Sequence, residues 1–173
     1  MKVDIDKIPQ LMGDVDENAD YIDEIVQGLV DSCCSTLDNY IKWVNDDILN
    51  DKKHPITNAE LDDIIMTIPS LCYFAGEQQE KLGIKCDVSK SSRNLMYNKI
   101  FSDAVGTAGV KKATADMQLF NEDMVSVIYD RAYSIIKSKI AFATEVLQSA
   151  KKVITRRMTE SELSRISVNK ERM

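Results

Sequence analysis

The feature that most constrains the fold is an apolar pattern at helical spacing from about Lys111 to Met158, which no proline or glycine interrupts. One row within it recurs at alternating steps of four and three: Tyr129, Tyr133, Ile136, Ile140, Ala143, Leu147, Ala150 and Ile154. Such a row is the seam of a long helix that packs lengthwise against another helix. At about 1.5 Å per residue the helix would span roughly 70 Å. The pattern therefore predicts an elongated helical body or an oligomer.

A second apolar row lies beside the first. It comprises Val125, Ile128, Ala132, Ile135, Phe142, Val146 and Val153. Two adjacent rows make a face wider than a two-stranded seam requires, so we expect more than one partner helix. The predicted oligomer interface lies on the first row, at Tyr129, Tyr133, Ile136, Ile140, Leu147 and Ile154.

Shorter patterns predict the remaining helices. A first helix is expected over about 20–50, and the capping-box sequence from Thr57 to Glu60 predicts the start of a second. Pro69 is expected to kink or break that helix, and Gly83 to end it. A third helix is expected from Val88 to the Gly106–Gly109 turn.

These patterns predict an all-α fold: an elongated helical hairpin or bundle with a long C-terminal coiled-coil-like helix. No alternating pattern typical of strands is present in the sequence. The expected organisation is an acidic flexible lead-in over residues 1–19, a single helical domain over 20–158 and a polar C-terminal tail over 159–173. No apolar stretch is long enough for a transmembrane helix, and no secretory signal is recognisable, so we expect a cytoplasmic protein, of the host cell if it is viral.

Charge is distributed unevenly along the chain. Residues 1–63 carry five Lys and Arg against sixteen Asp and Glu, whereas residues 131–173 carry ten Lys and Arg against four Asp and Glu. One interpretation is a solvated acidic end and the usual basic bias at a helix C-terminus. The other is a basic region for a polyanion and an acidic face for a basic partner protein, with Asp20, Asp23, Glu24 and Asp31 as the candidate acidic contacts.

The sequence offers little catalytic chemistry. It contains no phosphate-binding loop, no dinucleotide-binding loop and no Glu-x-x-His pair, and His54 is its only histidine. Its four cysteines lack zinc-site spacing, so we interpret them as reduced, packed thiols. We therefore expect a protein that is not an enzyme and that holds no metal or cofactor.

Basic side chains on the long helix are the candidate nucleic-acid contacts. They are Lys137, Lys139, Lys151, Lys152, Arg156 and Arg157. Lys137 and Lys151 are two heptads apart and share a face, so repetition around an oligomer would give a positive surface along which phosphates can lie. Tyr97, with Arg93 and Lys90, could add a base-stacking site. The alternative is a solvated outer face, with the tyrosines in the core.

The stretch from Val125 to Leu147 resembles the C-terminal helix of small phage recombination mediators, similar to that of T-even phages. In that family an aromatic helix carries an Ile-Lys-Ser-Arg/Lys element and is followed by a basic end. Here the element is Ile136-Lys137-Ser138-Lys139, with Phe142-Ala143 just after it. The resemblance covers about the last third of the chain. It implies a non-catalytic homo-oligomer that binds single-stranded DNA and helps to load a recombinase onto strands coated by a single-strand-binding protein.

Two features depart from the family pattern: the acidic first helix, and a middle region without a basic DNA-contacting signature. Other hypotheses therefore stay open beside an accessory protein of DNA recombination or replication. One is a viral, protein-binding inhibitor of host defence whose acidic surface imitates nucleic acid. Another is a helical structural adaptor. All three hypotheses imply a protein partner, whereas only the first requires single-stranded DNA.

Overall fold

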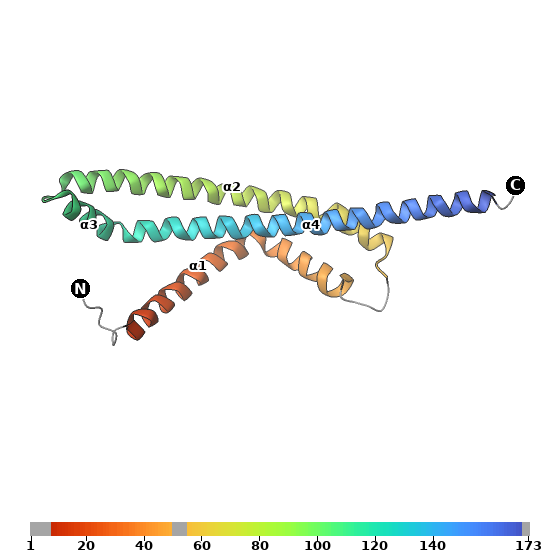
Figure 1. The fold of residues 1–173 in the computed structure, drawn as a ribbon, viewed down its shortest axis with the longest axis horizontal. Coiled ribbons are helices and arrows are strands. Elements are labelled where there is room, and N and C mark those ends of the chain that lie inside the picture. The colour runs from red at the N-terminus through yellow and green to blue at the C-terminus, as the bar shows by residue number, and fades with distance from the viewer. Residues whose placement is uncertain (1–7, 50–54, 171–173) are drawn as a thin grey trace. The chain divides into compact units, whose positions relative to one another are not determined.

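The computed structural model describes residues 8–49 and 55–170 and confirms the all-α class (Figure 1). The described residues form four α-helices and contain no strand. Their order is α1 (Ile8–Trp43), a π-helical continuation η2 (Val44–Leu49), α2 (Asn58–Asp103), α3 (Ala108–Gln118) and α4 (Phe120–Lys170). The helix expected over 20–50 begins earlier, at Ile8. Most of the segment predicted to be a flexible lead-in is therefore part of α1.

The start of α2 confirms the predicted capping box. The Thr57 backbone N–H donates to Glu60 Oε2 at 2.6 Å, and the Glu60 N–H donates to Thr57 Oγ1 at 3.2 Å. These reciprocal bonds satisfy two backbone donors that a helix start otherwise leaves open.

The predicted end of the helix at Gly83 and the predicted third helix from Val88 are wrong, and Pro69 does not break α2. One helix runs from Asn58 to Asp103 through both Pro69 and Gly83, and no separate helix begins at Val88. Pro69 lies on the exposed side of α2, where water can hydrate the carbonyl that loses its intrahelical donor. The buried residues Ile68 and Ala75 hold the helix in place on either side of the proline.

The long C-terminal helix is confirmed, but its boundaries differ from those predicted. The helix is interrupted at the buried Leu119, which separates α3 from α4. α4 then continues to Lys170, so the described part of the predicted polar tail is helical as well. The glycine-containing turn before α3 is confirmed, and Gly106 in it has a φ of 127° that favours glycine.

The described helices contribute residues to two compact units. The first unit combines α1 up to Cys33 with Gln78–Ile135, and the second combines Cys34–Glu77 with the rest of α4 from Ile136. In the first unit the buried side chains are those of Val26, Val30, Leu82, Cys86, Ala115, Leu119 and Ala132. In the second they are those of Cys34, Leu37, Val44, Ile48, Leu61, Ile64, Ile68, Ala75, Ile136, Ala143, Leu147 and Ala150.

Gly83 allows α2 and α4 to approach closely within the first unit. A Cβ atom at this position would lie 3.2 Å from Cε2 of the Tyr133 ring. The glycine therefore serves as a packing surface for an aromatic side chain and does not end the helix.

We predict that Gly83→Val lowers the free energy of unfolding by about 1–3 kcal/mol, because the added methyl groups overlap the Tyr133 ring. Gly76→Val is the matched control, since a Cβ at Gly76 meets nothing within 4 Å. Urea unfolding followed by circular dichroism measures both variants. Equal stability of the two would contradict this packing role.

Tyr40 joins α1 to α2 in the second unit. Its hydroxyl donates to Asp63 Oδ2 at 2.7 Å. Burial of the phenol and this hydrogen bond raise the pKa of Tyr40 to about 12, because both disfavour the phenolate.

We predict that one tyrosine titrates near pH 12 in the folded protein and that Tyr40→Phe removes this step from the ultraviolet absorbance titration. The folded-state pKa lies above the unfolded value of about 10. The stabilisation by Tyr40 is therefore complete below about pH 10 and is lost as the pH rises through about 12. Asp63→Asn should lower this pKa, and an unchanged titration in that variant would rule out the hydrogen bond as a cause.

Candidate nucleic-acid and partner interfaces

Half of the six candidate nucleic-acid contacts on α4 are exposed and unengaged. Lys137, Lys151 and Lys152 are all exposed, and none of them pairs with another residue in the described ranges 8–49 and 55–170. All three belong to the second unit. They leave three ammonium groups on one helix available to an anionic ligand.

The other three candidates bind groups of the protein itself. Lys139 Nζ lies 2.6 Å from Asp38 Oδ2, and both side chains are about one-third exposed, at 32% and 33%. Arg157 donates to Asn58 Oδ1 at 2.6 Å and to the Ile56 carbonyl, which ties α4 to the start of α2. These two cations therefore have structural contacts within the second unit.

Arg156 has a weaker engagement. Its Nε lies 2.8 Å from Glu160 Oε1, one turn along the same helix, and this hydrogen bond raises the pKa of Arg156. Both side chains are largely exposed, and exposed pairs of this kind contribute little to stability. Arg156 can therefore exchange Glu160 for another anion.

The predicted oligomer interface is covered largely by the chain itself. Ile136 has 0% and Leu147 8% of its surface exposed, and Tyr129, Tyr133, Ile140 and Ile154 are half-buried. A side chain with no exposed surface has nothing to offer to a second copy. The exposed apolar residues on α4 include three from the second row: Phe142 at 56%, Val125 at 44% and Val153 at 37%.

The predicted acidic face is exposed on α1 in the first unit. Asp20, Asp23, Glu24 and Asp31 all point to solvent, whereas Val26 and Val30 are buried. None of these four carboxylates forms an ion pair or side-chain hydrogen bond with the part of the chain that the structure describes. Together they give α1 a negative potential that a cationic partner could use.

The basic and aromatic groups on α2 are engaged inside the first unit. Arg93 pairs with Asp123 at 2.7 Å and lies 3.7 Å from Asp116. Its guanidinium lies 5.1 Å from the Tyr97 ring centroid, and Tyr97 in turn stacks on Phe101 at 5.9 Å. The candidate base-stacking surface of Tyr97 is thus filled largely by its own neighbours.

Lys90 also has a partner within the protein, at the contact between α2 and α4. It lies 3.2 Å from Asp130, which also accepts a hydrogen bond from the buried Cys86 thiol at 3.7 Å. The pKa of Lys90 is raised mainly by its hydrogen bond to Cys86 and, to a smaller extent, by its hydrogen bond to Asp130. The cluster fastens the two helices to each other.

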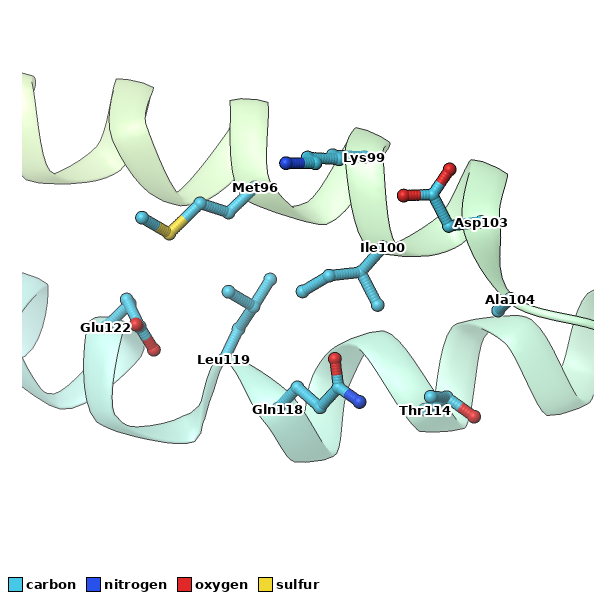
Figure 2. A pocket seen from close by; sticks show the side chains of 9 residues that line it. All are labelled: Met96, Lys99, Ile100, Asp103, Ala104, Thr114, Gln118, Leu119 and Glu122. Atoms are coloured by element: carbon cyan, nitrogen blue, oxygen red, sulfur yellow. The ribbon is translucent and has the colours of Figure 1, made fainter.

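A pocket of about 480 Å³ lies where α2, α3 and α4 meet in the first unit. Figure 2 shows Ile100 and Leu119 facing each other across it, with Lys99 and Asp103 on the α2 side and Glu122 on the α4 side. The hydroxyl in its lining, on Thr114, donates to the Val110 carbonyl at 3.0 Å and so is engaged by the backbone of its own helix. The apolar residues Ile100 and Leu119 lie at the point where the helix is interrupted between α3 and α4.

The cysteines and acidic groups show no metal centre in the described ranges. The four cysteines are free thiols, with Cys34 and Cys86 buried and Cys33 and Cys72 half-buried. Burial raises the pKa of the Cys72 thiol, which makes it less nucleophilic. No group of three or more His, Cys, Asp or Glu in the described residues could hold a metal ion. His54 lies outside those residues.

None of the described helices has the length and apolar character needed to cross a membrane. The chain matches no protein-family model, no curated protein and no solved structure. The functional interpretation therefore depends on the residues and geometry described above.

We predict that Lys139→Ala lowers the free energy of unfolding by about 1 kcal/mol, because it removes the partly buried pair with Asp38. Lys137→Ala is the matched control and should change stability by less than about 0.5 kcal/mol, as exposed substitutions usually do. Chemical denaturation of both variants is the measurement. If both lysines prove equally dispensable, the division into structural and available cations fails.

Proposed function

We propose that the protein is a non-catalytic, oligomeric accessory protein of phage-type DNA recombination or replication. It binds single-stranded DNA and a recombinase or a single-strand-binding protein. The observation that carries the proposal is the set of unengaged cations Lys137, Lys151 and Lys152, exposed on the helix that resembles phage recombination mediators.

The electrostatics of these lysines suit a phosphate backbone. Lys137 and Lys151 are separated by four turns of α4, or about 21 Å at 1.5 Å per residue, so they can contact well-separated phosphates of one strand. The net charge of the chain is −6, so binding is local, weak and sensitive to salt. Repetition of the same face around an oligomer would add the contributions of its copies.

The acidic face of α1 supplies the second part of the proposal. Its four exposed carboxylates (Asp20, Asp23, Glu24 and Asp31) would repel DNA and attract a basic surface of a protein partner. A chain with a cationic surface in one unit and an anionic surface in the other could hold a strand and a DNA-processing protein at the same time.

The same acidic face favours a second candidate, a viral inhibitor that imitates nucleic acid. In that case α1 would bind the nucleic-acid site of a host defence protein and the lysines of α4 would have no ligand. A helical structural adaptor is a third candidate. DNA binding separates the first candidate from these two.

We predict that the triple variant Lys137→Ala/Lys151→Ala/Lys152→Ala binds a fluorescently labelled single-stranded oligonucleotide at least tenfold more weakly at low salt. The loss should be similar for all sequences, because the contacts are to phosphates. The dependence of log affinity on log salt should flatten by about 2, since about 0.7 is expected for each lost phosphate contact on single strands. Fluorescence anisotropy across a salt series measures both effects.

The matched control is Lys42→Ala/Lys99→Ala/Lys112→Ala, which removes the same charge from exposed positions on other helices. It should weaken binding far less. Equal losses in the two triple variants would show that net charge, and not the α4 face, governs binding. No binding by the parent protein at micromolar concentration and low salt would end the DNA proposal.

A further inference from the structure

An apolar groove lies between α2 and α4 in the first unit. It has a volume of about 450 Å³, and its apolar lining consists of Ile84, Val88, Val125 and Tyr129. Ile84 is 63% exposed and Val88 62%, and Leu95, two turns further along α2, is 72% exposed. Large aliphatic side chains at successive steps of four and seven on one helix make a surface that fits a second helix.

Three charged side chains line the groove: Lys85, Glu122 and Arg93, of which Arg93 is already paired with Asp123 and Asp116. Lys85 lies at one end, with its Nζ 5.8 Å from the Tyr129 ring centroid. Glu122 lies at the other end, where its Oε2 is buried and has no hydrogen-bond partner among the residues of the described ranges. An unpartnered, buried carboxylate oxygen is costly, so this end favours an incoming cation.

The chain presents a helical surface with a matching pattern. On α4 in the second unit, Phe142 is 56% exposed, Val146 is half-buried and Val153 is 37% exposed. Their steps of four and seven are the same as those of Ile84, Val88 and Leu95. Close to this row lie the exposed Glu145 and Arg156, and Arg156 forms an exposed pair with Glu160.

We propose that the groove of one copy receives the 142–156 segment of α4 from a second copy, running parallel to α2. Phe142 then lies against Ile84, Val146 against Val88 and Val153 against Leu95. The same register places Glu145 towards Lys85 and Arg156 towards the unpartnered oxygen of Glu122. This inference rests on the homo-oligomer part of the proposed function, and it is independent of DNA binding.

Groove and segment are different surfaces, so two copies either exchange the contact reciprocally in a two-fold dimer or make it once and leave one groove and one segment open. In the second case each copy still offers its own groove to another, and the assembly closes into a ring or grows as a filament. At about 100° per residue, Lys137 and Lys151 lie on the side of α4 away from Phe142, Val146 and Val153, so they stay available in every copy. Lys152 flanks Val153 at the edge of the contact.

The test uses sedimentation velocity on the full chain. The parent protein should sediment as a dimer or a larger species, whereas Val88→Asp and Val153→Asp should each be monomeric at the same concentration. Mixed in equal amounts, the two variants should form a dimer that cannot extend, because one intact groove then meets one intact segment. An interface in which Val88 meets Val88, or Val153 meets Val153, would not be rescued by mixing.

A second pair of variants covers the case in which a buried aspartate disturbs folding. Lys85→Glu and Glu145→Lys should each weaken assembly at least tenfold through like charges, and the double variant should recover it. Met117→Asp is the control, since Met117 is 82% exposed on α3, away from the groove lining. Circular dichroism checks the helix content of each variant.

The outcomes distinguish this inference from the proposed function. A parent protein that is monomeric at all concentrations would overturn both the groove contact and the oligomer part of the function. A parent oligomer that none of these variants weakens would overturn the groove contact alone. DNA binding is read separately by anisotropy, so its loss or persistence does not decide the question of assembly.

Discussion

Burial of one face of α4, formed by members of both apolar rows, is the constraint on which the rest of the structure depends. Ala132, Ile136 and Ala143 each have 0% of their surface exposed on a helix of 51 residues. A face of this length can leave water only if other helices lie along it. In each unit α2 supplies part of that cover, through the Gly83–Tyr133 contact in the first and the Arg157–Asn58 bond in the second.

This constraint explains which features of the fold could be predicted. The apolar rows and the Thr57–Glu60 capping box are local, and both predictions are confirmed. The effects of Pro69 and Gly83 could not be predicted from local rules, because the gain from covering α4 exceeds the local cost of continuing α2 through them. Leu119 carries no local signal for a break, and only its burial in the three-helix contact accounts for it.

The same limit applies to the candidate sites. The basic side chains of α4 were identifiable by charge alone, but the pairing of Lys139 with Asp38 joins residues 101 positions apart and leaves no pattern in the sequence. The seam predicted to hold copies together is covered within the chain, while the second row is left partly exposed. Periodicity shows that a face is apolar, and only the tertiary structure shows what covers it.

Arg93 has a consequence for the mechanics of the first unit. Its guanidinium binds carboxylates on both sides of the break at Leu119, Asp116 on α3 and Asp123 on α4. The Asp116 and Asp123 side chains are nearly half exposed, so dissolved ions screen their ion pairs with Arg93. The apolar contacts of the buried Leu119 are affected far less by salt. Salt should therefore weaken the ion pairs that span the junction of α3 and α4, while the buried contact of Leu119 keeps the two helices together.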